Sequence, residues 1–264
     1  TKMLSDLSAT TVNAYGIGFN AKGYDEMEYA RASAKHSNAL LHEYYVTPED
    51  VTNAIPIITA SYDEPFGNAS AIPAYFFSLF AKQDGVNTML AGDGGDEIFA
   101  GNARYAKQKL FEMYHHVPSS IRKYFLEPAV FNMPLGDKLH PLRKIRSYME
   151  QANIPMPDRM ETYNFMHRTP LPEILHLDFL QLINPDEPAE NLREVYDRTQ
   201  SDSPLKRMLH LDLKIALADN DLRKVNRMCE LAGVDVRYPM LDEELVEFSA
   251  RVPSGMLLKG QELR

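Results

Sequence analysis

The order of secondary-structure patterns in the first third of the chain constrains its fold most. Three segments rich in β-branched, aromatic and other apolar residues are typical of strands, at residues 11–19, 40–46 and 86–92. Helix-forming stretches separate them, and Thr47 with Pro48 provides the cap and first-turn proline of one such helix. Strands that are separated by helices pair in parallel through right-handed crossovers. The expected fold class is therefore α/β, with an open parallel sheet and flanking helices.

The pattern changes from about Phe111 onward. Strand patterns cease, prolines recur, and helical stretches of about 8–15 residues follow one another. Ser203 and Pro204 have the types of a helix cap and first-turn residue, and "VDVRYP" at 234–239 is an extended segment between two helical ones. We therefore expect an α/β part over residues 1–110 and a helical part over residues 111–264 packed on it.

Composition narrows the class of protein further. No uninterrupted apolar run reaches about 18 residues, which argues against a membrane span, and the opening "TKMLSDLSAT" does not have the pattern of a signal peptide. The single cysteine, Cys229, suits a reducing compartment, so we expect a cytoplasmic protein. A net charge of -9 without a long lysine or arginine tract argues against nucleic-acid binding.

The segment "TMLAGDGGDEIFAGNARY" at residues 88–105 concentrates glycines and carboxylates directly after a predicted strand. Ligands of open α/β sheets bind beyond the carboxyl ends of the strands. Glycines there let the backbone approach a ligand closely, and the start of the helix that follows favours anions. The segment therefore has the features of a loop that binds an anionic small molecule.

Carboxylates repel a bound anion, so their presence in an anion site requires a cation between the carboxylate and the anion. Mg²⁺ is usually held by one or two carboxylates and by phosphate oxygens, so Asp96 can hold the metal of a metal–nucleotide complex. Asp93 can then act as a base or as a second metal contact. The alternative is structural, because Asp and Glu are common at helix starts and glycines are common in turns.

Five motifs in a fixed order connect the chain to a known family. The motifs "YGIGF", "GYDEMEYAR", "DEPFGNAS", "GDGGDEIFAG" and "VRYPMLDEELVEF" resemble the synthetase domain of the asparagine synthase family, which has the adenine nucleotide α-hydrolase-like fold of the ATP-pyrophosphatases. The resemblance runs from about Val12 to the C-terminus and is weak between about Phe111 and Leu205. It implies that residues 1–110 are a nucleotide-binding α/β part.

The resemblance also implies an activity. Family members bind ATP and Mg²⁺, adenylate a side-chain carboxylate, usually that of aspartate, and let ammonia displace AMP. The ammonia comes from a glutaminase domain, which lies outside this chain. The expected partners are thus small molecules, namely ATP, aspartate or a related carboxylate, and ammonia; a homodimer is left open.

Eight residues receive roles from the resemblance. Ile17 and Gly18 would border the adenine, and Ala91 and Gly92 would touch the nucleoside through their backbones. Ala91 stands where many relatives have serine, so one hydroxyl contact is missing.

The remaining four roles are catalytic, metal-binding or substrate-binding. Asp93 stands where asparagine-forming enzymes have glutamate, and would manage protons on the attacking amine. Asp96 occupies the metal-ligand position. Asp235 as a catalytic residue and Arg237 as a substrate-binding residue lie in the segment that lines the substrate side; the alternative for this pair is a surface ion pair.

Several family elements are not found within these residues. The serine–glycine pyrophosphate loop, the C-terminal catalytic lysine and the nucleophilic cysteine of the glutaminase are among them, and Lys259 is too early to be that lysine. Cys229 is predicted to be a small core residue. We therefore expect these residues alone to be inactive. Three functions stay open: an asparagine synthase-like ligase, a relative that adenylates a peptide- or sugar-linked carboxylate, and a non-catalytic binding module.

Overall fold

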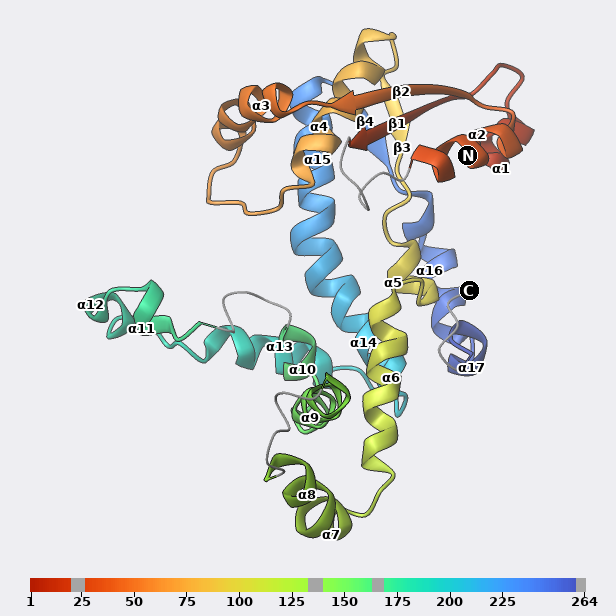
Figure 1. Cartoon of the computed structure of the whole chain (residues 1–264). Helices are drawn as coiled ribbons and strands as arrows, with labels where there is room; N and C mark the ends of the chain where they lie inside the picture. The colour runs from red at the N-terminus through yellow and green to blue at the C-terminus, as the bar shows by residue number, and fades with distance from the viewer. Residues whose placement is uncertain (20–26, 133–139, 163–168, 260–264) are drawn as a thin grey trace. The chain divides into compact units, whose positions relative to one another are not determined.

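The computed structural model describes residues 1–19, 27–132, 140–162 and 169–259 (Figure 1). The chain divides into two compact units. Unit 1 consists of Thr1–Asp93 and Ala218–Pro239, and unit 2 of Gly94–Leu217 and Met240–Arg264. The division of the chain between residues 110 and 111 remains a prediction.

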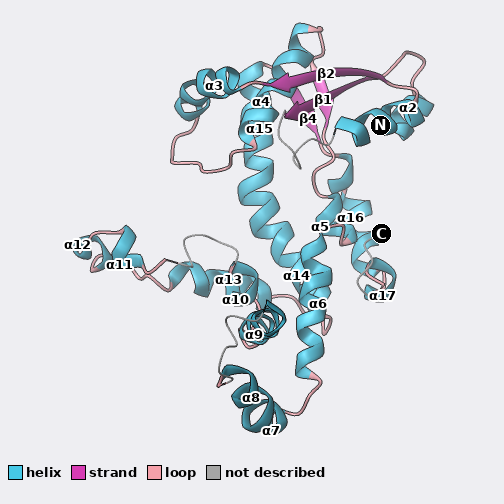
Figure 2. Ribbon diagram, in the orientation of Figure 1, coloured by secondary structure: helices cyan, strands magenta, loops and turns pink. Residues whose placement is uncertain are grey.

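The described residues of unit 1 include four strands in two parallel pairs. β1 (Asn13–Phe19) pairs with β2 (Leu40–Val46), and β3 (Thr88–Leu90) pairs with β4 (Asp235–Arg237). Its helices are α1 (Lys2–Leu7), α2 (Met27–Ser37), α3 (Pro48–Ser61), α4 (Ala71–Gln83) and α15 (Leu222–Ala232). Parallel strands flanked by helices confirm the predicted fold class (Figure 2). The partner of β3 comes from the extended segment near the end of the chain.

The helix after β2 begins as its sequence predicts. Thr47 Oγ1 accepts a hydrogen bond from the Asp50 backbone N–H at 3.2 Å, and Asp50 Oδ2 accepts one from the Thr47 N–H at 2.8 Å. Pro48 occupies the first helical position, where no N–H is needed. This capping box fixes the direction in which the chain leaves β2.

The core of unit 1 lies where α4 packs on α15. Buried residues from β2, α3, α4 and α15 form one apolar cluster, made of Val46, Ala54, Ile58, Ala71, Phe76 and Met228. Cys229 is 3% exposed, and its Sγ lies 3.2 Å from Ser78 Oγ. The prediction that Cys229 is a core residue is thereby confirmed.

Unit 2 is built mainly of helices. They are α5 (Gly95–Phe99), α6 (Ala103–His115), α7 (Ser119–Ile121), α8 (Glu127–Phe131), α9 (His140–Ala152), α10 (Asp158–Glu161), α11 (Leu171–Ile174), α12 (Leu177–Leu180), α13 (Glu187–Asp197), α14 (Pro204–Asp212), α16 (Glu243–Arg251) and α17 (Ser254–Leu257). A π-helical segment, η1 (Arg122–Leu126), joins α7 to α8. Two further segments lie at the limits of the units, η3 (Leu213–Asp221) and the 3₁₀ turn η4 (Pro239–Leu241).

A polar cluster sits inside the core of unit 2. Tyr105 is fully buried and donates a hydrogen bond from its hydroxyl to Asp212 Oδ2 at 2.6 Å. Arg104 forms an ion pair with the same carboxylate. Because Asp212 is only 4% exposed, these two partners satisfy a charge that burial would otherwise make costly. The cluster joins the first turn of α6 to the end of α14.

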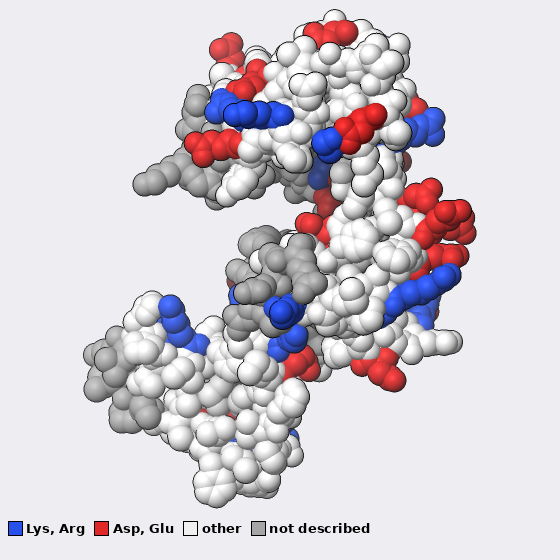
Figure 3. Space-filling model, turned by 90° about the vertical axis from the view of Figure 1, so that its right-hand side faces the viewer, with Lys and Arg blue, Asp and Glu red and all other residues white. Residues whose placement is uncertain are grey.

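The surface carries charged side chains of both signs. Figure 3 shows lysine and arginine interspersed with aspartate and glutamate on the face that it presents. Within the described residues, each helix is too short or too polar to cross a bilayer.

Candidate functional site

A cavity of ≈360 Å³ lies in unit 1 at the carboxyl end of β3. Three consecutive residues of the glycine–carboxylate loop line it, namely Ala91, Gly92 and Asp93. The remaining walls come from β1, β3, α4, α15 and β4. They contribute apolar side chains such as Phe77 and polar ones such as Lys224. The cavity therefore lies where α/β sheets hold their ligands.

Strand pairing positions the loop. Leu90 is aligned with Arg237 across the β3–β4 pair, and the backbone N–H of Ala91 donates to the Arg237 carbonyl at 2.9 Å. This bond fixes the chain at the last residue before the glycines. A side chain at Gly92 would meet no atom within 4 Å, so there is open space beside the Gly92 backbone. A ligand can approach the main chain closely at this point.

Asp93 is the acidic group of the cavity. Burial raises the pKa of its carboxyl above the usual range, and the ammonium of Lys224 partly opposes this effect. Lys224 lines the same cavity from α15, is 11% exposed, and donates from Nζ to Asp221 Oδ1 at 2.7 Å. A carboxyl group whose pKa is raised by burial is a better proton acceptor than an ordinary aspartate.

Two neighbours of Asp93 are poor candidates for a nucleophile or a base. Burial raises the pKa of the Cys229 thiol, and the nearby charge of Asp93 adds to this rise. Burial and Asp93 also raise the pKa of Tyr238, whose hydroxyl donates to Asn226 Oδ1 at 2.9 Å. Both groups are therefore protonated at neutral pH, where neither a thiolate nor a phenolate is available as a nucleophile or base.

Sequence reasoning did not select Lys224. The available pattern was the spacing of Asp221 and Lys224, three residues apart on a charged helix. Such a pair is common on solvated helix faces. Only the packing of α15 beside the loop after β3 shows that Lys224 also faces the cavity.

The structure does not bring the side chains of Asp235 and Arg237 into this cavity. They form an ion pair with each other at 2.8 Å, and both are exposed, 52% and 70% respectively. Val236, between them, lines the cavity. Because side chains alternate along a strand, its two neighbours lie on the opposite face of β4. This geometry is the surface ion pair that the sequence left open as the alternative; the catalytic and substrate-binding roles remain predictions.

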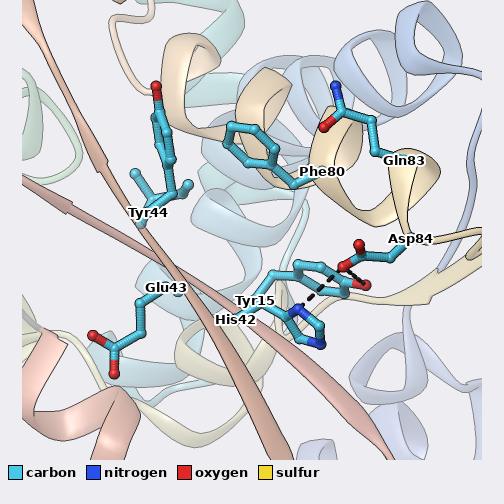
Figure 4. Close-up of a pocket in the computed structure, with 9 residues that line it drawn as sticks. Tyr15, His42, Glu43, Tyr44, Phe80, Gln83 and Asp84 are labelled. Carbon is cyan, nitrogen blue, oxygen red and sulfur yellow. Dashed lines mark hydrogen bonds and ion pairs between the residues drawn. The ribbon is translucent and has the colours of Figure 1, made fainter.

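Ile17 lines a second cavity of unit 1, of ≈200 Å³ (Figure 4). Tyr15 lines both cavities. The Tyr15 hydroxyl donates to Asp84 Oδ2 at 3.1 Å, and His42 Nδ1 lies 3.1 Å from the same oxygen. Burial, followed by the effect of Asp84, raises the pKa of Tyr15 to about 12. Gly18, the next residue along β1, is buried and aligned with Tyr45 of β2.

Asp96 belongs to unit 2 and lies in the first turn of α5, where its side chain is exposed. Its carboxylate lies directly over Gly101, since a Cβ at that position would overlap Oδ1 of Asp96. Gly101 thus leaves the room that this carboxylate occupies. Within the residues that the structure describes, no group of three or more metal-ligating side chains gathers.

Unit 1 has the features of an α/β small-ligand site. Parallel strands are flanked by helices, and a cavity at their carboxyl ends contains a carboxylate and an ammonium. A family model described as "Asparagine synthase" matches residues 1–264. The chain belongs to the asparagine synthase family, as its motifs predicted.

Curated relatives agree with this assignment. The chain is 24% identical over 250 residues to asparagine synthetase [glutamine-hydrolyzing] 1 of Bacillus subtilis, which covers 94% of this chain and 38% of the relative. It is 26% identical over 255 residues to a putative asparagine synthetase [glutamine-hydrolyzing] of Mycobacterium tuberculosis, covering 91% and 35%. A putative asparagine synthetase of Methanocaldococcus jannaschii is 33% identical over 118 residues, covering 45% and 22%. The chain thus spans little more than a third of the first two relatives.

Proposed function

We propose that this chain is the synthetase part of an ATP-dependent amide-forming ligase of the asparagine synthetase type. Family membership and the names of the relatives support this proposal. The observation that carries it is the cavity at the carboxyl end of β3, where Asp93 and Lys224 face the same space as the backbone of Gly92. In the whole protein, the side-chain carboxylate of aspartate is adenylated and ammonia then displaces AMP.

The residues present fit a nucleoside at this end of the sheet. The open space beside Gly92 leaves the main chain of Ala91 and Gly92 accessible. Ile17 and Gly18 lie on β1, and Ile17 borders the neighbouring cavity, whose lining includes Tyr44 and Phe80. These apolar and aromatic side chains suit an adenine ring. ATP, when bound, supplies the adenylyl group.

Asp96 is the residue that would bind a magnesium ion in this proposal. The carboxylate of Asp96 is exposed, and Mg²⁺ bound to phosphates needs only one or two protein carboxylates. Its charge, when the ion is bound, neutralises phosphate oxygens. Asp96 would hold the ion, and Gly101 would keep room for the carboxylate beside α5.

The residues of the cavity would handle the proton of the attacking amine. Asp93 accepts this proton, since burial raises the pKa of its carboxyl. The ammonium of Lys224 favours the ionised form of Asp93, which is the form that can act as the base. Arg237 would bind the substrate carboxylate after leaving Asp235, which costs little because the pair is exposed. We place this chemistry in the cytoplasm, with ammonia delivered by a glutaminase domain.

Amide formation by the full-length protein tests this function. The assay supplies ATP, Mg²⁺ and ammonium with aspartate, glutamate or a sugar-linked carboxylate, and it measures AMP and the amide product. We expect AMP and asparagine from aspartate, and a kcat at least about 100-fold lower in Asp93→Asn, since a general base typically contributes that much. Asp202→Asn, at an exposed position, is the matched control.

Two outcomes would contradict the proposal. Amidation of another acceptor but not aspartate would overturn the assigned substrate. Absence of AMP release with every carboxylate, from a folded protein, would overturn the ligase assignment itself.

A further inference from the structure

Unit 2 contains a cavity of ≈290 Å³ that the proposed function does not use. It lies among α5, α14, α16 and α17, and much of its wall is aliphatic, from Ile98, Leu209, Leu213, Val246 and Leu257. An apolar cavity of about 150 Å³ is already large enough to bind benzene. This one therefore has room for a six-carbon ring with a small polar group attached.

Two polar side chains in the wall lack a hydrogen bond within the part of the chain that the structure describes. Among the described residues, the imidazole of His210 makes no hydrogen bond, and Thr199 Oγ1 is buried without a donor or acceptor beside it. Burial lowers the pKa of His210, and the charges of Lys214 and Arg198 lower it further, so the ring is neutral at pH 7. Polar groups in such a place normally have a partner, and a bound ligand can provide it.

The charges near His210 favour an anionic ligand. Lys206 lines the cavity one helical turn before His210 on α14, so the two side chains share a face of the helix. The Lys206 ammonium donates to the Ala250 carbonyl, and a lysine has three N–H donors in all. Lys214 and Arg198 lie near the same imidazole. Glu97 is the acidic residue of the lining.

We propose that this cavity binds a small aliphatic monocarboxylate. The hydrocarbon part lies among Leu209, Leu213 and Leu257, and the carboxylate accepts hydrogen bonds from Lys206 Nζ and from the N–H of the His210 ring. The inference is independent of the proposed ligase activity, because all of these residues belong to unit 2 and none is assigned to the reaction.

Direct binding measurements on the 264-residue chain test this site. Cyclohexanecarboxylate, cyclohexanol and cyclohexylamine have the same ring and differ in the charge of the head group. Saturation-transfer NMR titrations should show that the carboxylate binds with a Kd of about 1 mM, as expected for so small a ligand. Its affinity should be at least about tenfold higher than that of the amine.

Two variants and one control locate the binding. Lys206→Met and His210→Leu should each weaken carboxylate binding about tenfold, because each removes a hydrogen bond to a charged group. Neither should change cyclohexanol binding more than about threefold. Lys35→Met, at an exposed position on α2, should leave both affinities unchanged. Thermal unfolding shows whether each variant is folded. If His210→Leu does not fold, the result for Lys206→Met alone tests the inference.

Three results would overturn the inference. They are equal binding of the three probes, carboxylate binding that Lys206→Met leaves unchanged, and the lack of any saturable binding of cyclohexanecarboxylate. Because no nucleotide enters the assay, its outcome is separate from that of the ligase test.

Discussion

Lys224 and Asp93 face the same cavity from different elements of unit 1, α15 and the loop after β3. The Lys224 ammonium donates to Asp221 at 2.7 Å and also favours the ionised form of Asp93. One cation thus interacts with two carboxylates. Burial thus makes Asp93 a better proton acceptor than an ordinary aspartate, which is the property that the proposed mechanism requires.

The raised pKa of Asp93 predicts a dependence of stability on pH. Burial raises the pKa in the folded state, so the folded chain binds more protons than the unfolded chain between the two pKa values. Stability from this group is therefore full below the unfolded pKa of about 4 and is lost as the pH rises through the folded pKa. In Asp93→Asn, this decrease in stability with rising pH should be absent. Urea unfolding from pH 4 to pH 7 measures the free energy of unfolding in both proteins.

The control for this experiment is Asp202→Asn, at an exposed position. It should follow the wild-type profile over the same range. If Asp93→Asn loses as much stability as the wild type between pH 4 and pH 7, the carboxyl of Asp93 does not have a raised pKa.

The hydroxyl of Tyr105, in the buried polar cluster of unit 2, should contribute measurably to the stability of the protein. Tyr105→Phe removes the hydrogen bond to Asp212 Oδ2 while keeping the ring. Bonds to buried charged groups contribute about 1.5–3 kcal/mol, so the free energy of unfolding should fall by about that amount. Urea denaturation measures the change. Tyr124→Phe, at a position that is 77% exposed, should cost less than about 0.5 kcal/mol; equal losses in the two variants would argue against the cluster.

The absence of a side chain at Gly101 should be needed for the position of the Asp96 carboxylate. In Gly101→Ala the new Cβ overlaps Oδ1 of Asp96, so the carboxylate must move. A displacement of about 1 Å can cost roughly 100-fold in rate. We therefore expect ATP-dependent turnover of the full-length protein to fall at limiting Mg²⁺. Gly255→Ala, where the Cβ meets open space, is the control; identical turnover in both variants would contradict a role for the Asp96 position.

Local structure was predictable where the residues that decide it are close in sequence. The cap Thr47 and the first-turn proline Pro48 are adjacent in sequence, and the structure confirms both. The pairing of β3 with β4 was not predictable in this way, because it depends on packing between two segments that are far apart in the sequence. A short strand such as Asp235–Arg237 has too few residues to show an alternating pattern.

The candidate site, too, was predictable only where neighbouring residues in the sequence determine it. The loop at Gly92 and Asp93 follows a strand, so its place at the sheet edge could be expected. The cavity residue Lys224 resembles any exposed helix lysine until α15 is packed. Asp235 and Arg237, in contrast, were selected from the sequence but form an exposed pair outside the cavity. Residue type alone does not tell on which face of a strand a charged side chain lies.

Pyrophosphate exchange tests the central claim most directly. The full-length protein, with its carboxylate substrate and Mg²⁺, should incorporate labelled pyrophosphate into ATP. Asp96→Asn should lower this exchange at least about 100-fold, because it removes the charge that would hold the metal beside the phosphates. Asp202→Asn should exchange at the wild-type rate. An exchange rate that Asp96→Asn leaves unchanged would contradict the assignment of this loop as the metal–nucleotide site.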